Sequence, residues 1–380
     1  MKFSVDRDVF SDAVSFAVRL LPQRPTQPLL SGVLIEASDG QVTISSFDYE
    51  VSSRTHVSAN VDEPGRALVS GRLLNEIANR LPHADVSMYS EDSRVQVKCG
   101  PASFSLPAMP VEEYPTIPTI DSVSGKVPGE EFANAVAQVA VAASRDDVTP
   151  VITGVQFEVT ENSLALTATD RYRVALRNVN WEPVEAREEL SALVPVKIVT
   201  EVGKSFAQAD VVSISIVKNE DRELIAFSDG QKTVTSLLIK GNYPPVRRLF
   251  PDSTDHHAII NTNDLIEATT RVGLVLEKDA ALRFSFSEGN VTLEAAGSET
   301  AQASESIEVH LAGEEMVVSL RPQFLLDGLR ATHSEFTKIA FTKTDNPNKP
   351  GPVLITRQNS KDDSDADSFR YLLQPNLLLR

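Results

Sequence analysis

The chain has a single cysteine, Cys99, and no uninterrupted run of about 18 apolar residues. One cysteine cannot form an internal disulfide or build a thiolate zinc site, which favours synthesis in a reducing compartment. The amino-terminal stretch Met-Lys-Phe-Ser-Val-Asp-Arg-Asp also lacks the apolar core of a secretion signal. We therefore expect a cytoplasmic protein with no membrane partner.

Positive charge is also scarce. Lysine and arginine total 36 against 53 aspartate and glutamate, a formal net charge of −17. This balance excludes a protein that coats nucleic acid with a wholly basic surface, but it allows a basic lining within an acidic shell. The 41% hydrophobic and 23% charged fractions are typical of folded chains, and 380 residues predict about two to four domains.

Recognisable catalytic and metal motifs are missing from the sequence. It has no phosphate-binding G-x-x-x-x-G-K-[ST] loop, no G-x-G-x-x-G, no H-E-x-x-H and no G-x-S-x-G. His256 and His257 are adjacent, so on an extended segment they point to opposite sides, and we expect a surface linker there. The acidic run at 361–367 lacks the glycine and glutamate of a calcium loop and is expected to be solvated. We expect no cofactor and no metal.

A long-period repeat is the most informative feature. Alternating segments that begin at Val33, Val155 and Leu282 recur about every 125 residues, and each is followed at a constant distance by a second strand-like segment. Upstream of each pair lies an apolar stripe at helical spacing. The stripes are Phe10, Ala13, Val14 and Ala17; Phe132, Ala135, Val136 and Val139; and Leu265, Ala268 and Val272.

A second helix follows each strand pair. Its expected apolar sides are Leu73, Leu74, Ile77 and Leu81; Ile198, Val199, Val202 and Phe206; and Leu325, Leu326 and Leu329. The opposite sides carry Arg72, Asn75 and Asn79; Lys197, Thr200 and Lys204; and Gln323, Asp327 and Arg330. At the aligned polar position the three copies have Arg72, Lys197 and Gln323.

Each repeat therefore predicts an α+β unit with its helices on one face of antiparallel sheet. Proline-bearing junctions at 113–118 and 242–251 suggest domains at 1–118, 119–251 and 252–380. A repeat with one helical face per copy can line a concave surface or close a ring. Basic or amide side chains on that face suit phosphate contacts without base reading, although solvated helix faces often carry the same residues.

Four stretches carry a resemblance over the whole length. They are Arg24-Pro25-Thr26, Ala168-Thr169-Asp170-Arg171-Tyr172-Arg173, Tyr243-Pro244-Pro245-Val246-Arg247-Arg248-Leu249-Phe250-Pro251, and Tyr371-Leu372-Leu373-Gln374-Pro375. With the three repeats, these segments make the chain resemble the bacterial DNA polymerase sliding clamps, the beta subunits of DNA polymerase III.

The resemblance implies a non-enzymatic processivity factor of DNA replication. Two chains of three clamp domains would close head to tail into a six-domain ring, with helices inside and antiparallel sheets outside. The ring would encircle double-stranded DNA without sequence specificity and tether the replicative polymerase, the clamp loader and other DNA-processing proteins. The DNA-facing residues it implies are Arg24, Arg72 and Lys197, and the repeat extends the set to Gln323.

The resemblance also implies a pocket for short clamp-binding peptides that carry a glutamine and apolar anchors. Carried over by position, the pocket residues are Ile152, Thr169, Arg171, Tyr172, Arg173, Val174, Pro244, Arg248, Leu249, Leu372, Leu373, Gln374 and Pro375. Arg171 and Tyr172 stand where familiar members have glycine and histidine, and Gln374 stands where methionine is common. We expect a more polar and reshaped pocket.

At the implied dimer contact, Phe104 corresponds to an aromatic anchor that meets Leu274 and Val275 of the other chain. Familiar members have arginines beside this aromatic residue and a cluster of acidic residues on the facing surface. Here Lys98 is the cation near Phe104, and the acidic residues of the facing surface are Glu299 and Glu305. We therefore expect a seam that depends on apolar burial and is weakly sensitive to salt.

Two other readings remain open at this point. One is a hydrolase or transferase with its active site between domains. A catalytic activity that is lost on changing Asp170 but is insensitive to changes at Arg24 and Arg72 would favour it. The other is a three-domain scaffold for protein partners alone, a reading that binding to circular duplex DNA would exclude.

Overall fold

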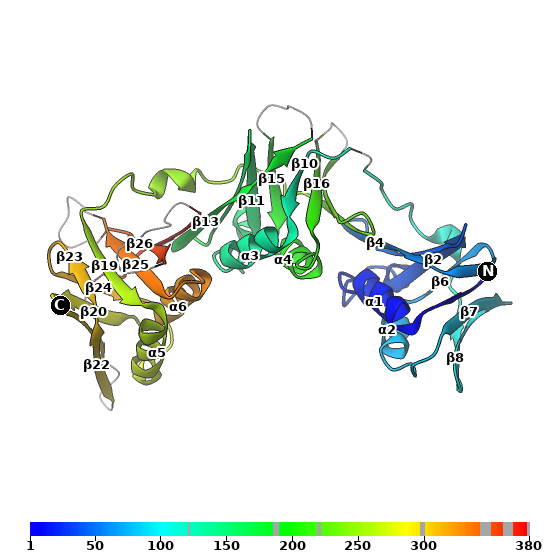
Figure 1. Cartoon of the computed structure of the whole chain (residues 1–380), viewed down its shortest axis with the longest axis horizontal. Helices are drawn as coiled ribbons and strands as arrows, with labels where there is room; N and C mark the ends of the chain where they lie inside the picture. The colour runs from blue at the N-terminus through cyan, green and yellow to red at the C-terminus, as the bar shows by residue number, and fades with distance from the viewer. Residues whose placement is uncertain are drawn as a thin grey trace. The chain divides into compact units, whose positions relative to one another are not determined.

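The computed structural model describes residues 1–120, 122–184, 190–218, 222–296, 301–342, 351–359 and 368–377. The chain divides into two compact units. Figure 1 labels the helices and strands of both. Unit 1 comprises Met1–Ala133, Trp181–Glu188 and Lys197–Leu238. Unit 2 comprises Asn134–Asn180, Glu189–Val196 and Ile239–Arg380.

Within its described residues, unit 1 contains two antiparallel sheets. The five-stranded sheet has the order β5 (Asn60–Glu63), β1 (Lys2–Val5), β7 (Val86–Glu91), β8 (Arg94–Cys99) and β9 (Ala102–Pro107). The nine-stranded sheet has the order β14 (Glu182–Pro183), β10 (Gly125–Pro128), β16 (Val211–Lys218), β17 (Glu223–Ser228), β18 (Lys232–Leu237), β4 (Val51–Ser58), β3 (Gln41–Phe47), β2 (Gly32–Ser38) and β6 (Gly65–Ser70). The β18–β4 pair joins strands of two different sequence repeats.

The described part of unit 2 is built in the same way. Its nine-stranded sheet has the order β15 (Leu190–Pro195), β11 (Gly154–Thr160), β12 (Ser163–Thr169), β13 (Arg173–Asn180), β27 (Phe369–Leu373), β26 (Val353–Gln358), β25 (Phe336–Phe341), β19 (His256–Asn261) and β23 (His310–Ala312). Its four-stranded sheet has the order β22 (Gln302–Glu308), β21 (Asn290–Ala296), β20 (Leu282–Ser287) and β24 (Met316–Leu320). Here β13 pairs with β27 of the last repeat.

The predicted repeat of paired strands is confirmed down to its register. Ile35 pairs with Ile44 in β2–β3, Phe157 with Leu166 in β11–β12, and Phe284 with Leu293 in β20–β21. These residues occupy equivalent positions of the three repeats, and all are buried. A one-residue slip would turn every buried side chain to the other face, so the conserved spacing of apolar residues fixes the pairing.

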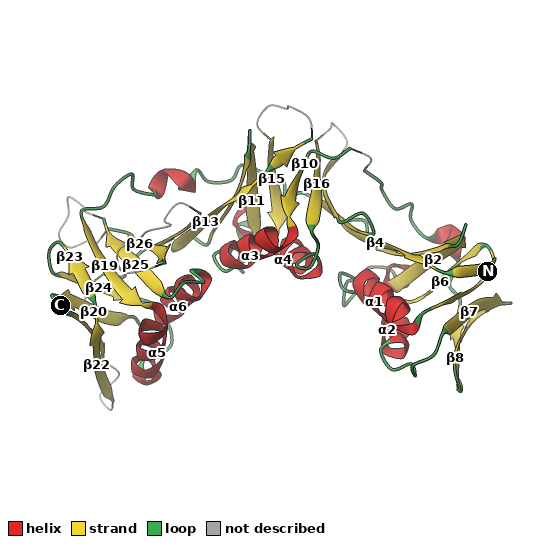
Figure 2. Ribbon diagram, viewed as in Figure 1, coloured by secondary structure: helices red, strands yellow, loops and turns green. Residues whose placement is uncertain are grey.

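The helices form where the apolar stripes predict them (Figure 2). The side chains of these stripes are largely buried. They are α1 (Arg7–Val18), α2 (Gly71–Ala78), α3 (Gly129–Ala140), α4 (Val196–Ser205), α5 (Thr262–Val272) and α6 (Pro322–Ala331). Asp6 and Asn261 cap α1 and α5 by accepting hydrogen bonds from backbone N–H groups of the first turn. The expected α+β fold is confirmed.

Leu73 was expected on the apolar side of α2, and this prediction is wrong. Its side chain is 43% exposed. The buried stripe runs through Leu74, Ile77 and Ala78 and continues to Leu81 after the helix, which leaves Leu73 at the edge of the stripe.

Both proline-bearing junctions pack against apolar side chains of a sheet. In unit 1, Tyr114 and Ile117 cover Leu34 and Leu68, and the Tyr114 hydroxyl accepts a hydrogen bond of 2.7 Å from the Phe47 backbone N–H. Burial raises the pKa of Tyr114 to about 12. In unit 2, Phe250 packs against the apolar cluster that includes Val174, Leu176, Leu354 and Leu372. The sheets are therefore buried on both faces next to the junctions.

The expectation of a surface linker at His256 and His257 is wrong. These residues begin β19, and His256 is buried, where its Nδ1 accepts a hydrogen bond of 2.9 Å from the Glu314 backbone N–H. Pairing of β19 with β25 and β23 explains the burial. The acidic run at 361–367 lies outside the described residues.

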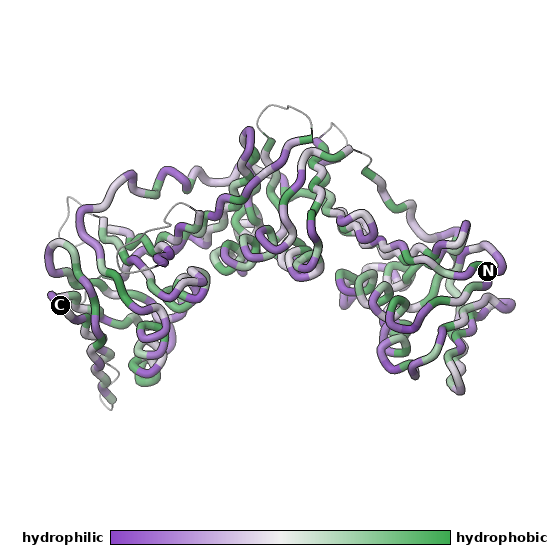
Figure 3. The backbone as a smooth tube through the Cα atoms, in the orientation of Figure 1, coloured by the Kyte–Doolittle hydropathy of each residue, from purple (hydrophilic) through white to green (hydrophobic). Residues whose placement is uncertain are grey.

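Hydrophilic and hydrophobic residues alternate closely along the chain (Figure 3). Among the helices described, none has the length and apolar character needed to span a membrane.

Candidate functional site

Unit 2 contains an apolar cavity of about 430 Å³ beside the carboxy-terminal strand β27. Its lining comes from the short helix Pro150–Thr153, the turn between β12 and β13, the second junction, and the end of β27. The lining residues are Thr149, Val151, Ile152, Thr169, Arg171, Tyr172, Arg173, Val174, Asn242, Pro244, Val246, Leu249, Pro352, Leu372 and Gln374. Apolar surface inside with a few polar groups at the edge is typical of a site for a small ligand or a linear peptide.

The turn at 169–173 is fixed by its own side chains. Asp170 Oδ1 accepts hydrogen bonds from the backbone N–H groups of Tyr172 and Arg173, at 3.0 and 3.1 Å. The Thr169 hydroxyl donates to the Arg173 carbonyl at 2.7 Å and accepts from the Arg171 N–H at 3.2 Å. The turn holds Arg171 at φ 79°, in the left-handed region, and leaves both Arg171 and Tyr172 exposed.

Arg173 is the centre of a buried polar network beneath the cavity. Its side chain is 8% exposed and pairs with Asp170 at 2.9 Å and with Asp327 of α6 at 2.6 Å. It also donates to the Tyr371 hydroxyl at 3.1 Å, and that hydroxyl donates to the Phe324 carbonyl at 2.7 Å. Burial raises the pKa of Tyr371, although Arg173 opposes the shift, so the hydroxyl stays protonated.

Two rings and two guanidinium groups stack beside the cavity, and of these Tyr172 and Arg173 line it. Tyr172 stacks on Phe324 with ring centroids 5.9 Å apart. Arg173 lies over the Phe324 ring at 4.4 Å, and Arg321 lies over Tyr172 at 5.1 Å. Gly328 allows α6 to come this close, because a Cβ there would lie 2.6 Å from the Tyr371 ring. Sequence reasoning missed Arg321 and Phe324 as neighbours of the pocket, because neither lies in the segments that carry the resemblance.

The cavity brings together many of the residues predicted for a peptide pocket. Those that line it are Ile152, Thr169, Arg171, Tyr172, Arg173, Val174, Pro244, Leu249, Leu372 and Gln374. Three others do not line it: Arg248 is exposed, whereas Leu373 and Pro375 are buried. Leu373 follows Leu372 in a strand and therefore points to the other face of the sheet.

The cavity also has lining residues that were not predicted, namely Thr149, Val151, Asn242, Val246 and Pro352. The first four lie within three residues of predicted positions and could have been found from them. Pro352 carries no such signal, because it comes from a distant segment before β26.

The four residues predicted to face DNA are all exposed. Arg24 lies in the loop after α1, whereas Arg72, Lys197 and Gln323 are the second residues of α2, α4 and α6. Arg72 pairs with Glu76 at 3.2 Å, and the Gln323 amide donates to Asp327 at 2.8 Å.

The residues predicted for a dimer seam lie at open sheet edges and at an exposed turn. Phe104, on the edge strand β9, is 38% exposed; Leu274 is 81% exposed and Val275 is half-buried, both in the turn after α5. Lys98 lies on the neighbouring strand β8. Glu305, on the edge strand β22, is already bound by Arg271 of its own chain at 2.7 Å. Glu299 lies outside the described residues.

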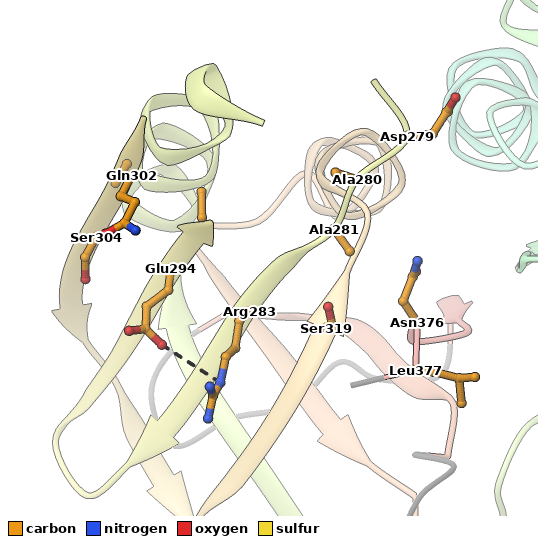
Figure 4. A pocket seen from close by; sticks show the side chains of 12 residues that line it. Asp279, Ala280, Ala281, Arg283, Glu294, Gln302, Ser304, Ser319, Asn376 and Leu377 are labelled. Carbon is orange, nitrogen blue, oxygen red and sulfur yellow. Dashed lines mark ion pairs between the residues drawn. The ribbon is translucent and has the colours of Figure 1, made fainter. Parts of the chain in front are cut away.

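A second recess, of about 820 Å³, lies over β20 and β21 of unit 2 (Figure 4). Asn376 and Leu377 of the carboxy-terminal segment border it, and Arg283 and Glu294 approach within 3.9 Å. Most other side chains of its lining are small or polar. No group of three or more histidine, cysteine or acidic side chains that could hold a metal ion occurs in the described part of the chain.

Comparison with known proteins covers the whole chain. Family models of the DNA polymerase III beta subunit match residues 1–118 (N-terminal domain), 126–245 (central domain) and 247–364 (C-terminal domain). The beta sliding clamp of Streptomyces coelicolor is 40% identical over 376 residues, 99% of each chain. That of Micrococcus luteus is 44% identical over 307 residues, 81% of this chain and 98% of its own.

The fold agrees with the sequence comparison. The crystal structure of the DNA polymerase sliding clamp from Bacillus subtilis superposes with a TM-score of 0.89 at 25% identity and covers 100% of both chains. The chain belongs to the DNA polymerase III beta subunit family, the bacterial sliding clamps.

Proposed function

We propose that the chain is the DNA sliding clamp of its cell: a cytoplasmic, ring-shaped homodimer that encircles duplex DNA and tethers the replicative polymerase. Full-length similarity in sequence and fold carries this proposal. The clamp is a processivity factor and not an enzyme. Because a closed ring holds DNA by topology, contacts to phosphates can be few and independent of sequence.

The ring is formed by two chains with domains at 1–118, 119–251 and 252–380 in each. The seam joins the open edges of β9 in one chain and β22 in the other, head to tail, and Phe104 meets Leu274 and Val275 of the partner subunit. The exposure of Phe104 and Leu274 supports this seam, because large exposed apolar side chains at a sheet edge favour association.

The exposed residues Arg24, Arg72, Lys197 and Gln323 contact the phosphates of the enclosed duplex. The cavity beside β27 binds short peptides of the polymerase, the clamp loader and other DNA-processing proteins. Its apolar lining supports this role, since a few buried anchors supply most of the affinity of a linear motif.

Primer extension on a long single-stranded circular template tests the function. The reaction contains the polymerase and clamp loader of the same bacterium. Adding the wild-type protein is expected to increase, by at least tenfold, the length of DNA that the polymerase synthesises in one binding event. The double variant Arg24→Ala, Arg72→Ala is expected to reduce loading several-fold, because two phosphate contacts are lost. The variant Arg66→Ala, which removes an exposed arginine on the sheet strand β6, is the control. Products of equal length with and without the protein would contradict the proposal.

A further inference from the structure

The second residue of α6 is linked to the cavity beside β27 by a series of side-chain contacts. Gln323 is exposed, and its amide donates a hydrogen bond of 2.8 Å to Asp327 Oδ1, one turn later in the same helix. Asp327 Oδ2 accepts a hydrogen bond of 2.6 Å from Arg173, which lines the cavity. The two oxygens of one carboxylate therefore join a residue of the predicted DNA-facing set to a residue of the peptide cavity.

These contacts become more buried from Gln323 towards the cavity. The Asp327 side chain is 20% exposed and the Arg173 side chain is 8% exposed. On its other side, the Arg173 guanidinium donates to Asp170 at 2.9 Å, and Asp170 accepts from the backbone N–H of Tyr172 at 3.0 Å. Because solvent and salt screen buried charges less than exposed ones, a change at Asp327 is expected to reach the turn that carries Tyr172.

The equivalent contacts in the other two repeats lie at the surface. Arg72 and Glu76 have the same four-residue spacing in α2, and their side chains are 88% and 52% exposed. In α4, Glu201 stands four residues after Lys197 and pairs with Lys204, whose side chain is 62% exposed. Among the described residues, the acidic side chain of α6 is therefore the one of the three that contacts a buried arginine.

Gln323 has enough donors to hold Asp327 and a DNA phosphate together. A glutamine amide carries two N–H donors, and the second can bind a phosphate oxygen while the first stays on Asp327. A side chain that contacts both sites loses its rotamer freedom once, so the ligand that binds second meets a side chain that is already ordered. DNA and peptide then favour each other's binding by the same factor.

We propose that Gln323 is a positioning residue that couples the two sites, so that the protein on DNA binds its partner peptides more tightly than the free protein does. The inference rests on the proposed function and adds a regulation of its peptide site by DNA. Gln323 acts through Asp327 and Arg173, and it does not itself line the cavity. This coupling favours recruitment of partners to loaded rings over recruitment to free ones.

Peptide affinity measured on and off DNA tests the coupling. The wild-type protein is loaded with a matched clamp loader and ATP onto a nicked circular plasmid, and gel filtration removes the loader and the free protein. A fluorescently labelled short peptide with one glutamine and leucine anchors is titrated into the loaded protein and into the free protein at the same salt concentration. The loaded protein is expected to bind this peptide about threefold more tightly, a coupling typical of contact networks.

Three variants separate the link from a general effect of DNA. Gln323→Met keeps the length of the side chain but removes both N–H donors, and it is expected to bind the peptide equally on and off DNA. Gln323→Lys restores donors for Asp327 and for a phosphate, and it is expected to recover the preference. Arg72→Met removes the donor at the equivalent position of the first repeat, and it is expected to load less well but to keep the threefold preference.

Each other outcome identifies which claim fails. Equal affinities of the wild type on and off DNA, or an unchanged preference in Gln323→Met, would overturn the inference and leave the proposed function intact. Loss of the preference in Arg72→Met as well would overturn the assignment to Gln323. Failure of the free protein to bind the peptide, or of the loaded protein to stay on the circle, would contradict the proposed function and the inference with it.

Discussion

Replacing Arg173 by methionine is expected to lower the free energy of unfolding by about 3 to 5 kcal/mol. Methionine keeps much of the apolar volume over the Phe324 ring but removes the charge that lies between Asp170 and Asp327. The two carboxylates then lack a cationic partner in a largely buried network, and the Tyr371 hydroxyl loses a donor. Urea unfolding followed by fluorescence or circular dichroism measures the loss.

A compensated variant separates lost charge balance from lost packing. Asn at positions 170 and 327 keeps an oxygen that can accept the backbone hydrogen bonds of Asp170 but removes both negative charges. The triple variant Arg173→Met, Asp170→Asn, Asp327→Asn is expected to recover at least half of the lost stability. If the triple variant is less stable than Arg173→Met alone, unpaired charge is not the cause.

Replacing Phe104 by alanine is expected to weaken the dimer by roughly 1,000-fold. Truncation of a central aromatic anchor costs about 2 kcal/mol, and a head-to-tail dimer contains two identical seams, so the loss is about 4 kcal/mol per ring. Phe104 lies exposed on an edge strand, so the fold of the chain is expected to be retained. Analytical ultracentrifugation over a concentration series measures the change, with the exposed Tyr49→Ala variant as a control.

The same seam is expected to tolerate salt. Glu305 is held by Arg271 of its own chain, and the hydrogen bond from Arg271 lowers the pKa of Glu305, so this carboxylate is already paired before dimerisation. Raising sodium chloride from about 0.1 to 1 M is expected to change the dimer dissociation constant less than threefold. Dissociation of the wild-type dimer at micromolar concentration by salt alone would contradict a seam that depends on apolar burial.

Much of the local structure is predictable from the sequence. Apolar residues at fixed offsets locate the three equivalent hairpins and their register, because period-two alternation and turn residues are local signals. The pairing of β18 with β4 and of β13 with β27 is not predictable in this way. These pairings join strands that lie far apart in sequence. They form through backbone hydrogen bonds at the strand edges, and those backbone groups leave no residue-specific pattern in the sequence.

The candidate site is predictable only where its residues belong to a continuous motif. The turn at 169–173 and the end of β27 were found by resemblance, whereas Phe324 was not, because its ring reaches the site only through the packing of α6 against Tyr371. Asp327 was assigned to the polar face of its helix. The structure turns its carboxylate toward Arg173, a contact that helical periodicity cannot reveal.

Topological retention on DNA tests the central claim most directly. The protein is loaded with a matched clamp loader and ATP onto a nicked circular plasmid, the plasmid is then cut once, and bound protein is separated from free protein. Retention on the circle and loss after linearisation is the predicted result, because an enclosing ring slides off a free end. Equal retention on circular and linear DNA would show adhesive binding and would contradict enclosure.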